Sequence, residues 1–231
     1  MVKRALELFS GTHSFGKVAY DYDYDVISVD INSYKGMKPP TYQEDILEWD
    51  YQQYPTGYFK IIWASPPCCR YSCLQNSWIG REKFINGTKQ IFTIDMLENQ
   101  RLESDELVKK VLEILEYFKP QYYIIENPNS GVLKKRNLLN DKPFHIADYC
   151  KYSNWGYKKR TRFWTNIPHL KLLTCKKDCN NIVNKKHKVE VSRDISGKVK
   201  RYRIPPKLIK EFFKQTEYNI INKINISTYN I

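Results

Sequence analysis

The chain has 231 residues, a formal net charge of +13 and six cysteines. This length suits one sizeable α/β domain with a modest appendage. The first thirty residues contain charges and no apolar stretch long enough for a signal peptide or a transmembrane helix, so we expect a soluble, intracellular protein without a membrane partner. The cysteines, two of them adjacent, do not form a disulfide framework typical of small secreted chains.

The positive charge is concentrated in the C-terminal half of the chain. Residues 131–215 contain 23 Lys and Arg but only 6 Asp and Glu, whereas residues 1–60 contain 6 basic and 9 acidic residues. This asymmetry predicts that the first half binds a small molecule and that the second half binds a polyanion, most simply a nucleic acid. A solvated, lysine-rich surface is the alternative that composition leaves open.

The N-terminal segment has the pattern of half a nucleoside-binding fold. We predict a strand at 5–9, a turn with two glycines at 10–16, a helix at 17–20 and a second strand at 25–30 that ends on Asp30. This order is the sequence form of a Rossmann-like half. No phosphate-binding lysine follows the glycines, so a nucleoside without phosphates, such as S-adenosylmethionine, fits better than a nucleoside triphosphate. An ordinary turn is the alternative.

A further acid and a stiff loop follow. If Asp45 follows a third strand, its carboxylate could accept a hydrogen bond from the exocyclic amine of an adenine. Residues 60–64 predict a buried strand, which Pro66 and Pro67 end because proline fixes φ and offers no N–H. We therefore expect Cys68 on a rigid loop at the carboxyl edge of the sheet, where it is a candidate nucleophile. A structural thiol buried in a turn is the alternative.

The next elements bring a carboxylic acid to the same edge. Residues 74–102 show no clean period and are expected to form an active-site loop with a broken helix. Residues 104–118 predict a helix that begins with a Ser104 cap, and residues 122–125 predict a buried strand. Glu126 follows that strand directly, so it should lie near the candidate nucleophile, although it could also cap a turn.

Four motifs in this order resemble those of the DNA (cytosine-5)-methyltransferases, especially the compact type of phages and large DNA viruses. They are Leu8-Phe9-Ser10-Gly11 with Phe15-Gly16, Ser65-Pro66-Pro67-Cys68 with Tyr71-Ser72, Glu126-Asn127-Pro128, and Arg160-Thr161-Arg162. The resemblance covers most of residues 4–166. It implies a Rossmann-like α/β fold, with a mostly parallel sheet and helices on both faces, that uses S-adenosylmethionine to methylate carbon 5 of cytosine in duplex DNA.

The resemblance also assigns roles to individual residues. Cys68 would add to carbon 6 of the cytosine, and Glu126 would absorb the charge that develops at ring nitrogen 3. Arg162, and less directly Arg160, would hold the exocyclic oxygen and orient the base, which a duplex must flip out. The residues expected to bind the methyl donor are Phe9, Gly11, Phe15, Gly16, Asp30, Ile31, Asp45, Ile46 and Pro66.

The sequence departs from the family pattern at a few positions near these motifs. Cys69 follows the expected nucleophile where glutamine is usual, and His13 lies in the donor loop. Lys158 and Lys159 precede Arg160 without the usual glutamine. None of these changes removes a group that the chemistry requires.

We expect a catalytic core at 1–166, a short basic target-recognition segment at 167–203, and a C-terminal helix and tail at 204–231. The short basic segment predicts phosphate contacts with little room for reading base edges. The helix should open near Pro205 and Pro206, and residues 216–231 should pack loosely.

The basic segment also contains a possible partial zinc site. Cys175, Cys179 and His187 have ligand chemistry, with Cys150 as the best fourth partner, but their spacing is not a standard one. We therefore expect a metal-free, lysine-rich loop with incidental thiols.

Two other functions compete with cytosine methylation of DNA. The same chemistry could act on transfer RNA, or the chain could be a catalytically silent nucleic-acid-binding protein. The joint presence of Cys68, Glu126 and Arg162 argues against a silent protein. The sequence does not specify an oligomeric state.

Overall fold

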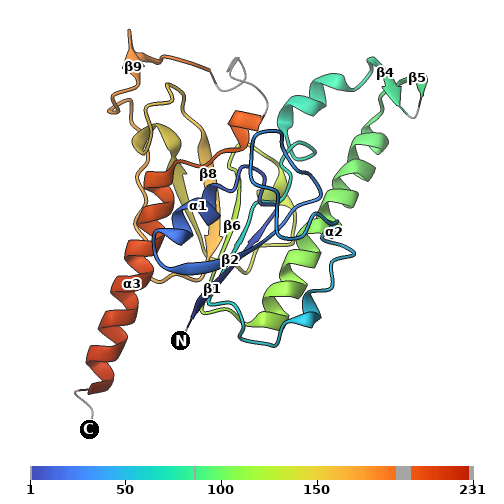
Figure 1. Ribbon diagram of the computed structural model, residues 1–231. Helices are drawn as coiled ribbons and strands as arrows, with labels where there is room; N and C mark the ends of the chain where they lie inside the picture. The colour runs from blue at the N-terminus through green and yellow to red at the C-terminus, as the bar shows by residue number, and fades with distance from the viewer. Residues whose placement is uncertain (1, 86, 191–198, 229–231) are drawn as a thin grey trace.

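The computed structural model describes residues 2–85, 87–190 and 199–228. Its centre is a six-stranded sheet with the order β2-β1-β3-β6-β8-β7 (Figure 1). The first four strands in this order are parallel, and β8 runs antiparallel to both β6 and β7. The strands are β1 (Lys3–Leu8), β2 (Tyr24–Val29), β3 (Ile61–Ala64), β6 (Tyr122–Pro128), β7 (Phe144–Asp148) and β8 (Arg160–Thr165). The predicted α/β fold with a mostly parallel sheet is confirmed.

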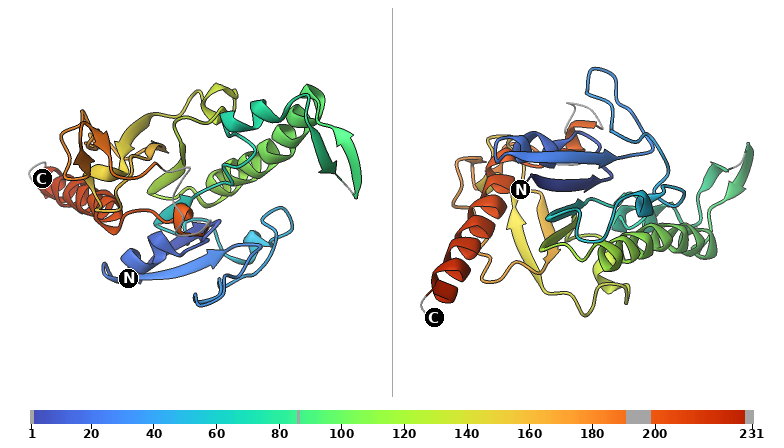
Figure 2. Two further views of the ribbon diagram at one scale, coloured as in Figure 1. Left: turned by 90° about the horizontal axis from the view of Figure 1, so that it is seen from above. Right: turned by 60° about the horizontal axis from the view of Figure 1, so that its bottom comes forward.

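Helices cover both faces of the sheet, as Figure 2 shows from two directions. Helices α1 (Ser14–Tyr20) and α3 (Pro206–Thr228) pack together on one face, and α2 (Ile94–Phe118) lies on the other. Successive strand residues alternate between the two cores because side chains in a strand point to opposite faces. Trp63 belongs to the core under α1 and α3, whereas Ile62 and Ala64 belong to the core under α2.

Stacked aromatic rings fasten the C-terminal helix to the first half of the fold. The ring of Phe15 in α1 stacks on Trp63 of β3 at 5.2 Å and on Phe213 of α3 at 5.5 Å. All three side chains are buried. Such pairs contribute beyond their buried area, so α3 is part of the core rather than an appendage.

Helix α2 begins earlier than the sequence suggested. Thr93 caps it, because the Thr93 hydroxyl accepts a hydrogen bond from the backbone N–H of Met96. The expected cap, Ser104, lies in the middle of the helix and donates instead to the carbonyl of Gln100. The side chain of Leu97 is buried, and this packing stabilises the first turns of the helix although the residues around Leu97 are mostly polar.

A small hairpin replaces the irregular loop expected before this helix. Strands β4 (Glu82–Ile85) and β5 (Thr88–Ile91) pair antiparallel and project beyond the body of the molecule beside the start of α2 (Figure 1). A short 3-10 helix, η2 (Cys73–Trp78), joins the Cys68 loop to this hairpin.

The expected third strand near Asp45 is not formed. Within residues 30–60, all of which the structure describes, the pairing with the sheet is a single bridge between Val29 and Tyr42, followed by the short helix η1 (Tyr51–Gln53). Asp45 lies instead in a turn, where its carboxylate accepts the backbone N–H of Leu47.

The remaining elements lie in the C-terminal half. They are η3 (Leu133–Lys135), η4 (Tyr149–Lys151), β9 (Ile182–Val183), β10 (Lys186–His187) and η6 (Val199–Tyr202). Helix α3 begins at Pro206, as predicted, and continues to Thr228, beyond the point where a loose tail was expected. Residues 191–198 of the expected recognition segment, and residues 229–231 of the tail, lie outside the described residues. No described helix combines the length and apolarity that a membrane crossing requires.

Candidate active site

Cys68 and Glu126 line the same cavity at the carboxyl edge of the sheet. They meet because β3 and β6 are adjacent parallel strands, with Ala64 opposite Ile125. Cys68 lies four residues beyond the end of β3, and Glu126 lies near the end of β6, which ends at Pro128. The Nδ2 of Asn127 donates to the Pro66 carbonyl at 2.9 Å, which fixes one strand end against the other. The sequence prediction that these two groups converge agrees with this geometry.

A buried network of hydrogen bonds joins the loop that carries Cys68 to helix α2 and to the segment after β6. Tyr71 is fully buried, its hydroxyl donates to Asp105 of α2 at 2.8 Å, and its carbonyl accepts the N–H of Val132 at 2.8 Å. Arg136 pairs with the same Asp105 carboxylate. Cys68 is half-buried above this network, whereas Cys69 is exposed. The position of the Cys68 loop is therefore set by the core, and both Cys68 and the more exposed Cys69 line the cavity.

The cation nearest to these groups is Lys159. Its Nζ lies 3.7 Å from Glu126 Oε1, and only 13% of its side chain is exposed. The Tyr149 hydroxyl donates to the same Glu126 oxygen at 3.2 Å. Burial raises the pKa of the Cys68 thiol above its ordinary value, Lys159 opposes this rise, and Glu126 adds to it. The pKa of the Cys68 thiol therefore depends first on its burial and then on the opposed charges of Lys159 and Glu126.

A second set of residues lines the cavity just beyond the ends of β1 and β2. The carboxylate of Asp30 accepts the N–H of Gly11 at 2.8 Å through Oδ2 and the N–H of Asn32 at 2.8 Å through Oδ1. Phe9 and Gly11 both have positive φ, 57° and 49°, and so turn the chain sharply at the mouth of the cavity. The predicted donor-binding residues that line the cavity are Phe9, Gly11, Asp30, Ile31 and Pro66.

Phe15 and Gly16 lie behind this surface and do not line it. Their N–H groups donate to the two oxygens of the buried Glu7 carboxylate, at 3.0 Å and 3.1 Å. A Cβ on Gly16 would lie 2.7 Å from Glu7 Oε2. Burial raises the pKa of Glu7, and His13, 3.7 Å away, opposes the rise. Gly16 thus allows the start of α1 to approach Glu7, and Phe15 is a core residue.

Asp45 and Ile46 also lie outside the cavity. Ile46 is buried in the core under α2, and Asp45 belongs to the turn described above. The missing third strand explains the difference, because an acid that follows no strand is not delivered to the edge of the sheet.

The structure does not bring Arg160 and Arg162 to the cavity that holds Cys68. The register places Glu126 opposite Phe163 and Asn127 opposite Arg162, so Arg162 lies on the α2 face and Glu126 on the other. The Arg162 guanidinium lies over the Phe144 ring at 3.8 Å and lines a separate pocket with Trp164.

Arg160 points to the same side as Arg162. It forms two hydrogen bonds, of 3.0 Å and 2.8 Å, to the fully buried carboxylate of Asp148. The expectation that these arginines surround the cytosine therefore differs from the observed arrangement, because strand alternation brings Lys159 to the cavity in their place.

Some residues of the cavity were not predicted from the sequence. Glu7 could have been noticed as the one charge inside the apolar strand Ala5–Leu8, whereas the face of Lys159 depends on the strand register. Tyr202 comes from η6 and so brings the C-terminal segment back to the rim of the cavity. The unpredicted lining residues include Glu7, Asn32, Tyr34, Lys159, Tyr202 and Ile204.

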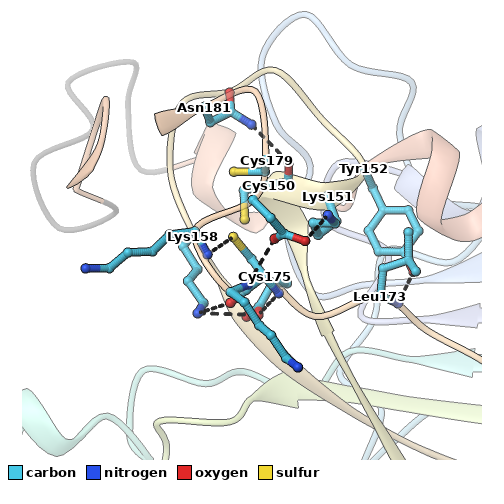
Figure 3. A network of polar contacts seen from close by, with 12 residues as sticks. Cys150, Lys151, Tyr152, Lys158, Leu173, Cys175, Cys179 and Asn181 are labelled. Carbon is cyan, nitrogen blue, oxygen red and sulfur yellow. Dashed lines mark hydrogen bonds and ion pairs between the residues drawn. The ribbon is translucent and has the colours of Figure 1, made fainter. Parts of the chain in front are cut away.

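A second cluster of reactive side chains lies away from this cavity, at the edge of the sheet beyond β7. The ligand atoms of Cys150, Cys175, Cys179 and His187 all lie within 4.8 Å of one another. Figure 3 shows the three cysteines pointing toward a common centre. The sequence suggested incidental thiols, but in the fold these four side chains converge.

Comparison with known proteins gives one close match. The chain is 34% identical over 223 residues to a probable DNA (cytosine-5)-methyltransferase of Frog virus 3 (isolate Goorha), and the match covers 90% of this chain and 97% of that protein. No protein-family model matches the sequence. Among solved structures, a "putative DNA modification methyltransferase" from an E. coli prophage has 17% identity and a TM-score of 0.43, with 71% of this chain and 46% of that chain covered. This chain thus spans about half the length of that structure.

Proposed function

This chain belongs to the DNA (cytosine-5)-methyltransferase family, and on that premise we propose that it transfers a methyl group from S-adenosylmethionine to carbon 5 of cytosine in DNA through a covalent adduct with Cys68. The observation that supports this most strongly is that one cavity is lined by Cys68, by Glu126, and by Gly11 and Asp30, which are hydrogen-bonded to each other. A nucleophile, a group for ring nitrogen 3 and a donor-binding turn are the parts that this reaction needs in one place.

The residues just beyond the ends of β1 and β2 suit the methyl donor. Each oxygen of the Asp30 carboxylate accepts one backbone N–H and keeps a further lone pair for a ribose hydroxyl. The hydroxyl oxygen of Ser10 is buried, lines the cavity and has no hydrogen-bond partner among the described residues, so it is available to a polar ligand. Phe9 and Ile31 offer apolar surface beside these groups. When bound, S-adenosylmethionine would supply an electrophilic methyl group on a sulfonium.

Cys68 starts the reaction. Carbon 5 of cytosine is not nucleophilic enough by itself, so the Cys68 thiolate adds to carbon 6, and the electron pair of the C5–C6 double bond moves toward ring nitrogen 3. Carbon 5 then takes the methyl group, and the bond from that methyl to the sulfonium breaks with its electron pair left on sulfur, which gives the neutral thioether S-adenosylhomocysteine. Water takes the proton from carbon 5, the electron pair of that C–H bond restores the C5–C6 double bond, and departure of the Cys68 thiolate frees the enzyme.

Glu126 and Lys159 stabilise the charge that develops during this addition. Glu126 would share a proton with ring nitrogen 3, and contacts from Tyr149 and Lys159 to its Oε1 support this role. We assign to Lys159 the cationic role near the base that resemblance gives to Arg162, because Lys159 lines the cavity. Arg160 then acts through Asp148, as a positioning residue for the edge of the sheet.

The proposed substrate is duplex DNA with the target cytosine turned out of the helix. The reacting atoms of a paired cytosine lie inside the stack and cannot reach a thiol that lines a cavity. The C-terminal half, with its excess of Lys and Arg, would supply the phosphate contacts.

The test is transfer of label from S-adenosylmethionine to duplex DNA and to transfer RNA, with Cys68→Ala and its matched control Cys69→Ala. The proposal expects label as 5-methylcytosine in DNA, lost with Cys68→Ala and kept with Cys69→Ala. A duplex of random sequence containing 5-fluorocytosine should trap a denaturant-stable adduct on Cys68, because the fluorine cannot leave as a proton does.

Other outcomes would replace parts of the proposal. Label in RNA alone would keep the chemistry and change the substrate. Absence of label from both nucleic acids, with binding retained, would leave a nucleic-acid-binding protein with this fold.

A further inference from the structure

The cluster of three cysteines and one histidine is assembled from three separate parts of the chain. Cys150 lies in η4 directly after β7, Cys175 and Cys179 lie in the following irregular segment, and His187 lies in β10. Cys150 and Cys175 are buried, and the other two side chains are half-buried. Residues 37 positions apart in sequence therefore present four soft ligand atoms to one point.

The separations within the cluster match the edges of a metal-centred tetrahedron. His187 Nε2 lies 3.7 Å from Cys175 Sγ and 3.5 Å from Cys179 Sγ. With Zn–S of about 2.3 Å and Zn–N of about 2.0 Å, a tetrahedral zinc ion separates sulfur from nitrogen by about 3.6 Å. All four ligand atoms lie within 4.8 Å of one another.

The backbone around the cluster is already shaped for ligation. Lys177 has a positive φ of 69°, and its N–H donates to Cys175 Sγ at 3.3 Å, which would stabilise a thiolate at that sulfur. Asn184 and Lys185 also have positive φ, as a tight hairpin turn between β9 and β10 needs, and this turn brings His187 back toward Cys179. Such strain in non-glycine residues persists where the surroundings hold it in place.

Polar contacts outside the four ligands hold the same arrangement (Figure 3). The N–H of Cys175 donates to the buried carboxylate of Asp148 at 2.7 Å. The side chain of Asn181 is buried and donates to the Cys150 carbonyl at 3.0 Å. Lys151 forms an ion pair with Asp178 at 3.0 Å, across the two segments that supply the cysteines. Supporting contacts of this kind orient the ligands of a metal site.

Apolar burial does not explain the order of this segment. Between residues 171 and 190, all of which the structure describes, only Cys175 and Asn181 are buried. Segments that bury so little apolar surface usually need a disulfide or a metal to offset the loss of chain entropy. The three cysteines are free thiols in the structure, which leaves the metal as the device that the geometry favours.

We propose that Cys150, Cys175, Cys179 and His187 bind one Zn²⁺ as a structural site. Four protein ligands complete a tetrahedron and leave no position for a substrate, so the ion would stabilise the fold rather than take part in the methyl transfer. Three thiolates and one imidazole are soft sulfur and nitrogen ligands, which favour Zn²⁺ over Mg²⁺ or Ca²⁺. The inference does not depend on the proposed methyltransferase function.

The site would fix the basic segment to the edge of the sheet beyond β7, and a chain of contacts leads from there to the cavity. Asp148 joins the N–H of Cys175 to Arg160 of β8, and Lys158 donates to the Cys175 carbonyl at 3.1 Å. The next residue, Lys159, lines the cavity. Zinc binding would thereby stabilise both the nucleic-acid surface and one wall of the cavity.

The test is the zinc content of the full chain, purified with a thiol reductant and without chelators, measured by inductively coupled plasma mass spectrometry. The proposal expects about one zinc per chain, with most of it lost in Cys179→Ser and His187→Gln, whose side chains are only half-buried. Cys73→Ser, an exposed thiol elsewhere in the chain, is the matched control and should keep its zinc. Co²⁺ added to the metal-free protein should give the visible bands of tetrahedral, thiolate-bound cobalt.

Protease resistance supplies a second readout that requires neither a variant nor methyl transfer. Chelation of the wild-type protein should expose residues 171–190 to limited proteolysis, and added Zn²⁺ should restore protection. The proposal is overturned if the reduced wild-type protein contains no zinc and takes up no cobalt, if Cys179→Ser and Cys73→Ser hold equal zinc, or if two of the cluster cysteines form a disulfide under reducing conditions.

Discussion

Lys159 Nζ lies 3.7 Å from Glu126 Oε1, and both side chains line the cavity that contains Cys68. The two charges act on the thiol in opposite directions, since Lys159 lowers the pKa of Cys68 and Glu126 raises it, while burial, the largest influence, raises it further. The pH dependence of Cys68 alkylation therefore reports the charges of Lys159 and Glu126.

The first prediction concerns the pH at which Cys68 becomes reactive. A thiolate forms as pH rises through the pKa, so loss of the cation in Lys159→Met should move the onset of alkylation to higher pH. Loss of the anion in Glu126→Gln should move it to lower pH, while methyl transfer falls roughly a hundred-fold because the group at ring nitrogen 3 is gone. The measurement is iodoacetamide labelling of Cys68 against pH, followed by peptide mass spectrometry.

Arg162→Met is the control for this first prediction. Arg162 lies over Phe144 in a separate pocket, so its loss should leave the labelling curve of Cys68 in place. If Arg162→Met shifted the curve and Lys159→Met did not, the assignment of the cationic role to Lys159 would be wrong.

The second prediction concerns binding of the methyl donor. Asp30→Ala removes the acceptor that fastens Gly11 and faces the cavity, and should weaken S-adenosylmethionine by roughly ten-fold or more, since hydrogen bonds to a charged group contribute about 1.5–3 kcal/mol. Isothermal titration measures this affinity. Asp45→Asn is the matched control, because Asp45 lies outside the cavity, and an equal loss in both variants would contradict the observed arrangement.

The third prediction separates packing from binding at Gly16. A Cβ there meets Glu7 Oε2 at 2.7 Å, and the Glu7 carboxylate cannot easily move because it is buried and accepts hydrogen bonds at both oxygens. Gly16→Ala should therefore destabilise the fold by about 1–3 kcal/mol. Urea denaturation followed by circular dichroism measures this free energy. Weaker donor binding with unchanged stability would instead indicate that Gly16 contacts the ligand.

The fourth prediction concerns the network that supports the Cys68 loop. Arg136→Met leaves the buried Asp105 carboxylate without its cation and should cost roughly 3 kcal/mol of stability. Glu98→Gln removes the exposed partner of the same arginine and should cost less than about 1 kcal/mol. Denaturant unfolding of the two variants measures both free energies. Equal losses of stability would mean that the buried Arg136–Asp105 pair contributes no more than the exposed Arg136–Glu98 pair.

The arrangement of the active-site strands could be predicted from local patterns in the sequence. Apolar runs followed by a glycine turn, by Asp30 and by two prolines predicted strands β1, β2 and β3, and the run before Glu126 predicted β6. Parallel neighbours deliver their carboxyl ends to one edge, so the meeting of Cys68 with Glu126 followed from strand order alone. The early start of α2 was missed, because a cap at Thr93 is recognised only when Leu97 is known to be buried.

The sequence by itself determined the fold class, and it predicted that Cys68 and Glu126 meet at the carboxyl edge of the sheet, because both depend on neighbouring residues and on strand order. Only the tertiary structure decided that Lys159, and not Arg162, faces Glu126, since a shift of one residue in the register of β8 reverses every side chain. Only the tertiary structure brought Cys150 to Cys175, Cys179 and His187. Irregular loops have no repeating pattern of apolar residues, so their sequence does not show which side chains come together. Contacts between residues far apart in the chain decide this.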